Sequence, residues 1–179
     1  DEVALLERAY QASRNSPESV ILTITPTLNC NFSCHYCYQG QNKESLVMTP
    51  ATQEALINFI KQKANPALGV KHVSITWFGG EPLLAKDIIY DISDHAISLK
   101  NKKNIRVSGS MTTNGYKLDV STMKKLNEKY ISRFQISLDG YDDGHNSTRK
   151  LRSGKGSFSR IWKNLLDLKE SNLQFHILL

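Results

Sequence analysis

The three cysteines of the chain lie close together in the segment LNCNFSCHYCYQG at 28–40. Cys30, Cys34 and Cys37 are separated by three and then two residues. Iron–sulfur clusters are held by cysteine thiolates, and a 4Fe–4S cluster normally takes four of them. Three thiolates therefore hold three irons and leave the fourth iron open. Such an iron can bind a substrate or cofactor that carries an amino and a carboxylate group.

Two other uses of these cysteines follow from their spacing. A closed zinc site takes four ligands, usually in two pairs. The fourth ligand would be His35, which lies between two cysteines, or the distant His72 or His95. Single buried cysteines without a ligand are common, but three of them in the polar loop NCNFSCHYC are unusual. The cysteine pattern therefore favours an open iron–sulfur cluster over a zinc site or inert thiols.

The elements that must position this loop alternate between strand and helix. Apolar and β-branched runs predict five strands, at 19–27, 72–80, 105–115, 131–140 and 173–179. Caps and helical spacing predict the intervening helices, at 49–64, 87–101, 120–129 and 157–171. This alternation predicts an α/β fold with a parallel sheet. The pattern alone does not distinguish a barrel from an open, doubly wound sheet.

The unusual short motifs all follow predicted strands. The cysteine segment follows the first strand, and the next three strands end in GGEP (79–82), TTNG (112–115) and SLDG (137–140). The carboxyl ends of parallel strands lie at one edge of the sheet, where α/β proteins form their active sites. We therefore expect the four motifs to meet at one rim.

The composition is that of a globular protein and excludes several classes. The 179 residues are 40% hydrophobic and 22% charged, close to the average for soluble domains. No apolar run reaches the roughly 18 residues of a membrane span, and the segment at 1–15 lacks the features of a signal peptide. An odd, clustered set of cysteines fits metal binding better than a disulfide framework. We therefore expect a cytoplasmic protein with no membrane partner.

The formal net charge of +6 gathers in two stretches, LKNKKNIR at 99–106 and TRKLRSGKG at 148–156. Basic stretches of this kind contact nucleic acid in some proteins. Lysines near the end of a helix are also favoured by its dipole. We interpret 99–104 as a solvated helix end, and we do not expect nucleic acid to be a partner.

The cysteine spacing, with Tyr36 before the last cysteine, resembles that of the radical S-adenosylmethionine (SAM) superfamily. The resemblance implies a partial (β/α)6 barrel whose cluster loop follows the first strand. It implies two cofactors, a 4Fe–4S cluster held by Cys30, Cys34 and Cys37, and S-adenosylmethionine bound to the open iron. In the family, reductive cleavage of S-adenosylmethionine gives a 5′-deoxyadenosyl radical, which abstracts hydrogen from the substrate.

The GGEP motif is similar to the family's Gly-Gly-Glu-Pro element, which binds the methionine amino group of S-adenosylmethionine. The resemblance therefore assigns Gly79, Gly80 and Glu81 to cofactor binding. Glycines permit close approach of the backbone, and a glutamate can pair with an ammonium group. The alternative is an ordinary glycine turn followed by a solvated acid.

Four more residues match family positions. Asn114 and Ser137 match positions that line the ribose and methionine region, although turn chemistry also explains them. Arg149 matches an arginine that reaches the cofactor carboxylate, for which its planar fork is suited, and Arg152 is the second choice. Tyr36 matches a residue that shields the cluster and the adenine edge, and its alternative is a core aromatic role.

The motif order also resembles one branch of the family. TPTLNCNFSCHYCY, GGEPLL, TTNG, ISLDG, HNSTR and GKGSF follow one another, over residues 20–170, as in the branch that modifies peptides and proteins, which includes sulfatase maturases. The resemblance implies a peptide or protein substrate and an electron donor such as flavodoxin or ferredoxin. Members usually carry a C-terminal SPASM or twitch extension with auxiliary clusters.

We divide the chain into an N-terminal helix or leader at 1–18 and a barrel at 19–179. The sequence ends on an apolar strand, before a sixth strand or an extension, so we expect the barrel to be incomplete. We expect a radical SAM oxidoreductase that acts as a peptide maturase. Two alternatives stay open: a zinc-stabilised module that binds nucleic acid or protein, and a non-catalytic relative with a peptide at the rim.

Overall fold

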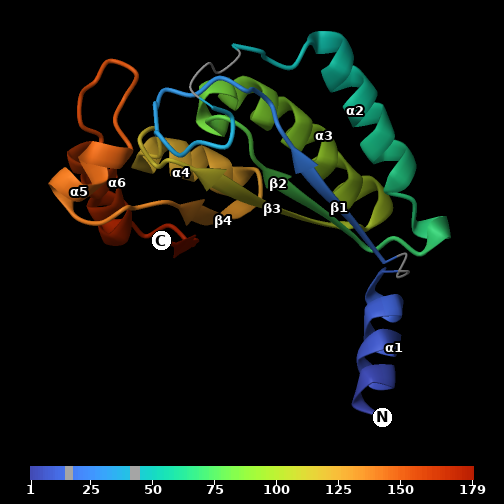
Figure 1. The fold of residues 1–179 in the computed structure, drawn as a ribbon. Helices are drawn as coiled ribbons and strands as arrows, with labels where there is room; N and C mark the ends of the chain where they lie inside the picture. Colours follow the sequence, from blue (N-terminus) through green and yellow to red (C-terminus); the bar gives the residue numbers. More distant parts are fainter. Residues whose placement is uncertain (15–17, 41–44) are drawn as a thin grey trace.

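The fold is built on one sheet of five parallel strands. The computed structural model describes residues 1–14, 18–40 and 45–179. The strands are β1 (Ser19–Ile24), β2 (His72–Trp77), β3 (Arg106–Thr113), β4 (Ile131–Ile136) and β5 (His176–Leu178). They lie in the order β1-β2-β3-β4-β5 (Figure 1). A strictly sequential order is typical of a barrel, whereas a doubly wound sheet reverses direction at a switch point.

The helices connect successive strands and cover the sheet. They are α1 (Glu2–Arg14), α2 (Pro50–Lys63), α3 (Lys86–Lys103), α4 (Val120–Glu128), α5 (Asp142–Thr148) and α6 (Phe158–Glu170), with the 3-10 helices η1 (Pro66–Leu68) and η2 (Pro82–Ala85). Each predicted helix and strand is present. Helix α5 was not predicted, because its sequence DDGHNST contains no apolar residue to show a helical period.

Helix caps and strand ends define the loops at the carboxyl edge of the sheet. The side chains of Thr49 and Asp119 cap α2 and α4, as their positions predicted. The strands end earlier than predicted: β2 stops at Trp77 and β4 at Ile136, so that GGEP and SLDG lie beyond the ladder. The motifs are therefore loop segments at the carboxyl edge of the sheet.

The two faces of the sheet differ in chemistry. One in-register row is buried and apolar, and it consists of Ile24, Trp77, Met111 and Phe134. The adjacent row points to the other face and is polar, and it consists of Thr23, Thr76, Ser110, Arg133 and His176. Helices α2, α3 and α4 all lie on one side of the sheet (Figure 1). Strands covered by helices on both faces would be apolar at nearly every position, so the alternation marks a sheet that is covered on one face.

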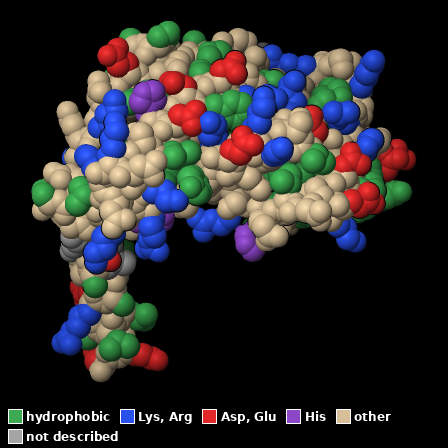
Figure 2. Space-filling model, turned by 180° about the vertical axis from the view of Figure 1, so that it is seen from behind, with side chains coloured by type: hydrophobic (Ala, Val, Ile, Leu, Met, Phe, Trp, Pro, Cys, Tyr) green, Lys and Arg blue, Asp and Glu red, His purple; other side chains and the backbone are tan. Residues whose placement is uncertain are grey.

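The outer surface carries charged side chains of both signs. Lys and Arg side chains are interspersed with Asp and Glu on the face seen from behind (Figure 2), a mixture typical of a solvated surface. No helix among the described residues is long and apolar enough to span a membrane.

Helix α1 projects away from the sheet (Figure 1). The division of the chain at residue 18 stays a prediction.

Gly109 on β3 packs against Ile131 on β4. The β3–β4 register shifts between Gly109 and Ser110, which is the geometry of a β-bulge. A Cβ atom at Gly109 would lie 2.6 Å from Cγ1 of Ile131. The residue must therefore be small for the two strands to pair at this point.

We expect Gly109→Val to destabilise the fold by about 1–3 kcal/mol, because the added carbons would overpack the β3–β4 contact. The free energy of unfolding from urea titration measures the effect. Gly144→Ala in α5 is the matched control, since a Cβ there would meet its nearest atom at 3.5 Å, and alanine should stabilise the helix by about 0.5–1 kcal/mol. Equal effects of the two substitutions would contradict the packing explanation.

Candidate active site

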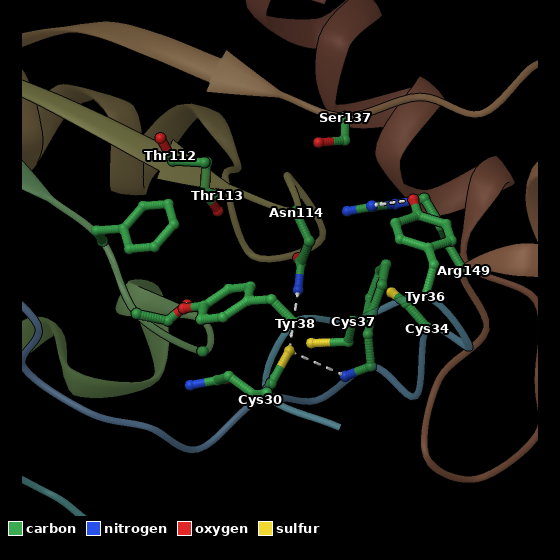
Figure 3. A pocket seen from close by; sticks show the side chains of 15 residues that line it. Cys30, Cys34, Tyr36, Cys37, Tyr38, Thr112, Thr113, Asn114, Ser137 and Arg149 are labelled. Atoms are coloured by element: carbon green, nitrogen blue, oxygen red, sulfur yellow. Dashed lines mark hydrogen bonds between the residues drawn. The ribbon is translucent and has the colours of Figure 1, made fainter. Parts of the chain in front are cut away.

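One cavity of about 280 Å³ lies at the carboxyl edge of the sheet (Figure 3). All three cysteines line it. The other predicted residues that line it are Tyr36, Gly79, Gly80, Asn114, Ser137 and Arg149. Residues from all four motifs thus meet at one rim, as expected from their places after strands. The sequence did not single out Gln39 and Thr112, which also line the cavity.

The cysteines are thiols rather than disulfide partners, and Figure 3 shows their sulfur atoms at the cavity. Cys30 and Cys34 are buried, whereas Cys37 is half-buried. The backbone N–H of Phe32 donates to the Cys30 sulfur at 3.4 Å, and the Asn114 amide donates to the same sulfur at 4.0 Å. The protein therefore supplies donors that suit a thiolate at Cys30.

The cysteine loop is anchored by a segment that is distant in sequence. Phe32 and Leu151 form an antiparallel bridge. Around it, the N–H of Ser33 donates to the Lys150 carbonyl and the N–H of Arg152 to the Asn31 carbonyl, each at 2.9 Å. The residues that follow α5 thus hold the loop on one side of the cavity.

The two glycines of GGEP hold the other side. A Cβ at Gly79, which has φ of +125°, would lie 2.5 Å from the Thr27 carbonyl oxygen, and a Cβ at Gly80 would overlap the Asn29 carbonyl. The N–H groups of Gly80 and Glu81 donate to these carbonyls at 3.1 and 2.8 Å. Both glycines are therefore required for packing against the start of the cysteine loop, in addition to lining the cavity.

Glu81 lies behind the cavity and does not line it. Its side chain is completely buried, and its carboxylate accepts hydrogen bonds from the Leu83 N–H, the Thr113 hydroxyl and the Asn114 N–H at 3.0, 2.7 and 2.8 Å. Burial raises the pKa of Glu81, and these donors oppose the increase. In this structure Glu81 joins the end of β2 to the end of β3, and its pairing with a cofactor amino group stays a prediction.

Asn114 and Ser137 both lie at the cavity, and Asn114 is tied to the protein. Its amide donates to the Asn31 side chain at 2.9 Å, and its side-chain oxygen accepts from the Tyr116 N–H at 3.0 Å. Asn114 thus links TTNG to the cysteine loop. Its contact with a ribose was inferred from resemblance and stays a prediction, as does that of Ser137.

Arg149 lines the cavity and is held there by two aromatic side chains. Only 9% of the residue is exposed. Its Nη1 donates to the Tyr36 hydroxyl at 2.6 Å, and its guanidinium lies 5.9 Å from the centres of the Phe32 and Tyr36 rings. Among the described residues, its buried Nε has no hydrogen-bond partner. A buried N–H without an acceptor is costly, but this nitrogen is enclosed by the protein, so an anionic ligand in the cavity would meet the other nitrogens of the guanidinium.

Asp139 completes this arrangement, although the sequence indicated only a turn there. The Tyr36 hydroxyl donates to its carboxylate at 2.5 Å, and the Thr148 hydroxyl donates to it at 3.0 Å. Burial and the bond to Asp139 raise the pKa of Tyr36. The phenol therefore stays protonated, accepting from Arg149 and donating to Asp139.

His145 fixes the main chain around Arg149. Its Nδ1 accepts from the Asp139 N–H at 3.3 Å, so Nε2 carries the proton and donates to Ser157 at 3.0 Å. The Ser157 hydroxyl then donates to the Arg149 carbonyl at 2.5 Å. The motifs SLDG, HNSTR and GKGSF thus form one hydrogen-bonded unit. His145 and Ser157 were not predicted as site residues, although His145 opens HNSTR and Ser157 lies in GKGSF.

The site fits the cofactors that the resemblance implies. Three thiols lie at one cavity and match a cluster with one open iron. Arg149 lines the same cavity, and its guanidinium is suited to a carboxylate. In contrast, no group of three or more His, Cys, Asp and Glu side chains among the described residues is placed to hold a single metal ion.

The His145 network has a consequence for stability. Burial, and then the charge of Arg149, lower the pKa of His145. The imidazole at position 145 therefore takes up a proton at a higher pH in the unfolded chain than in the folded chain. The contribution of neutral His145 to the free energy of unfolding is complete above about pH 6.5 and is lost as the pH falls below it.

We expect His145→Gln to lower the free energy of unfolding by about 1–3 kcal/mol at pH 7.5, because buried hydrogen bonds are lost. The further loss between pH 7.5 and 5.5 should be smaller than in the wild type. It should not vanish, since burial also lowers the pKa of His72. Urea titration at the two pH values measures both effects. His95→Gln, at an exposed position of α3, is the control, and an equal pH dependence in wild type and His145→Gln would contradict the assignment.

Comparison with known proteins agrees with this geometry. The family model of the radical SAM superfamily matches residues 24–179. The chain is 30% identical over 166 residues to the cysteine-type anaerobic sulfatase-maturating enzyme of Clostridium perfringens, covering 90% of this chain and 44% of that protein. It is 30% identical over 159 residues to the radical SAM cyclopropyl synthase TigE of Paramaledivibacter caminithermalis, covering 80% and 31%.

A solved structure shows the same architecture. Native anSMEcpe with bound AdoMet and the Kp18Cys peptide superimposes with a TM-score of 0.73 at 28% identity, over 89% of this chain and 42% of that one. The chain thus spans less than half the length of these relatives. The five-stranded sheet corresponds to the predicted partial barrel, and the zinc-stabilised module is not favoured. The family match over most of the residues, together with three cysteines at the rim of this barrel, shows that the chain belongs to the radical SAM superfamily.

Proposed function

We propose that the chain provides the catalytic barrel of a radical SAM peptide maturase. The single observation that carries this proposal is one cavity lined both by three cysteines and by a largely buried arginine. When bound, the cluster and S-adenosylmethionine supply reductive cleavage to a 5′-deoxyadenosyl radical, which abstracts hydrogen from the substrate.

The residues of the chain bind and orient these groups. Cys30, Cys34 and Cys37 hold three irons. Arg149 would bind the methionine carboxylate through its guanidinium, while Tyr36 and Asp139 hold that group in place. This arrangement is available before the cofactor binds, so little side-chain ordering is required on binding.

The remaining contacts lie around the same cavity. Asn114 and Ser137 face the ribose and methionine region. The Gly79 carbonyl, which accepts from the Tyr38 hydroxyl at 3.2 Å, is an acceptor for the methionine amino group, with Gly80 beside it. Glu81 acts from behind by fixing the Asn114 N–H.

The substrate is a peptide or protein. Support comes from the similarity to a sulfatase-maturating enzyme and to a structure that contains a peptide. An electron donor such as flavodoxin or ferredoxin reduces the cluster, in the reducing environment of the cytoplasm, without a nucleic-acid partner. We also propose that 1–18 is separate from the barrel at 19–179 and that the chain comes from the branch whose members usually carry a SPASM or twitch extension.

The full-length protein, reconstituted without oxygen with iron and sulfide and then reduced, should form 5′-deoxyadenosine from S-adenosylmethionine. Cys34→Ala should abolish both the visible absorbance of the cluster and this product, because one iron loses its thiolate. Liquid chromatography with mass spectrometry measures the product. A brown, iron-loaded wild-type protein that forms no 5′-deoxyadenosine would contradict the proposed function and favour a non-catalytic relative.

Arg149→Lys should weaken the binding of S-adenosylmethionine by roughly tenfold or more, because the planar fork that matches a carboxylate is lost. Calorimetry with the reconstituted, unreduced protein measures the affinity. Arg152→Lys is the matched control, since Arg152 is exposed and does not line the cavity. Similar losses in the two variants would show that Arg149 acts only through overall charge.

A further inference from the structure

The face of the sheet opposite the helices carries a continuous polar row. Thr23, Thr76, Ser110, Arg133 and His176 occupy paired positions on neighbouring strands from β1 to β5. The hydroxyls of Thr76 and Ser110 are 2.9 Å apart and hydrogen-bonded. Thr23, Arg133 and His176 of this row are exposed, so this face of the sheet meets a polar environment rather than an apolar layer.

A second cavity lies on this face. Its volume is about 240 Å³, and its polar lining comes from Thr76, Ser110, Thr112, Arg133 and Gln135. Thr112 also lines the cysteine cavity. The two cavities therefore adjoin at Thr112, so a molecule in the second cavity lies next to the proposed cofactor position.

The second cavity is positively charged. Arg133 supplies the only charged side chain among the described residues that line it. None of the ion pairs in the described part of the chain includes Arg133. Burial, followed by the charges of Arg106 and Arg133, lowers the pKa of His72 at the base of β2. The polar face thus has a positive potential, and an anionic group would be attracted to it.

We propose that the second cavity binds a carboxylate of the peptide substrate, through Arg133, with the Thr76 and Ser110 hydroxyls as hydrogen-bond partners. The inference rests on the proposed function, because it assigns the acidic group to the substrate of that same site. A guanidinium matches a carboxylate in shape and donor number. An anchor beside the cofactor cavity would hold the reacting carbon near the radical source.

The two arginines of the site then have different ligands. Arg149 is 9% exposed and held by Tyr36, as suits a cofactor that always binds in one position. Arg133 is exposed on β4 and lines the open polar face, as suits a substrate that must enter and leave.

Two blocked pentapeptides test the proposal, acetyl-Gly-Gly-Glu-Gly-Gly-amide and its glutamine counterpart. Binding is measured by calorimetry on the full-length, cluster-loaded protein with S-adenosylmethionine present. We expect the glutamate peptide to bind about tenfold tighter, as for a charge-assisted hydrogen bond. The difference should shrink at high salt. Arg133→Gln should abolish it, and Arg133→Lys should retain part of it.

Arg160→Gln is the matched control, because Arg160 is an exposed arginine on α6 and does not line the second cavity. It should keep the preference for glutamate. Unchanged binding of S-adenosylmethionine by Arg133→Gln shows that the variant is folded. Equal binding of the two peptides by the wild type, or a preference that persists in Arg133→Gln, would overturn the inference.

Formation of 5′-deoxyadenosine, measured on the same wild-type protein, separates this inference from the proposed function. A protein that forms the product without preferring the glutamate peptide contradicts the inference alone. A cluster-loaded protein that prefers the glutamate peptide but forms no product contradicts the proposed function and supports carboxylate binding at Arg133.

Discussion

The site depends on how a loop without regular structure is held in place. Residues 30–37 contain no helix or strand, so their own backbone hydrogen bonds do not fix the three sulfurs. Two neighbours do so instead. The glycines of GGEP pack against carbonyls at the start of the loop, and the segment at 150–152 pairs with residues 31–33. GGEP follows the end of β2, and the segment at 150–152 follows α5, which comes after β4. The sheet therefore determines where the sulfurs lie.

The buried polar groups near the loop are tolerable because nearly all of them are paired. Glu81 accepts three hydrogen bonds, and His145 both accepts and donates. A network of this kind is costly when one member is unpaired. The exceptions beside the cysteines among the described residues are the Arg149 Nε, the side-chain nitrogen of Asn31 and the side-chain oxygen of Gln39. Such exceptions are expected where a ligand completes the network.

Most of the fold and part of the site were predictable from the sequence. The strands were clear because β-branched residues alternate along them, and the cysteines, glycines and Arg149 belong to short motifs. Helix α5 was not predictable, because it lacks an apolar period. The contact between Tyr36 and Asp139 joins residues 103 positions apart, and local patterns carry no signal for it. The requirement for glycine at 79 and 80 was predicted, but the backbone that they approach is visible only in the folded chain.

Buried and exposed side chains alternate along the parallel strands, so the sheet has one apolar face and one polar face. A strand such as β4 buries Ile131, Phe134 and Ile136, while Arg133 and Gln135 stay exposed on the other side. Burying an unpaired guanidinium in an apolar layer would cost several kcal/mol by order of magnitude. Arg133 is therefore compatible only with a polar occupant on this face, whether water or ligand. Since Thr112 borders both cavities, an anionic ligand held there would lie within reach of the cysteine rim without displacing any residue that holds the loop.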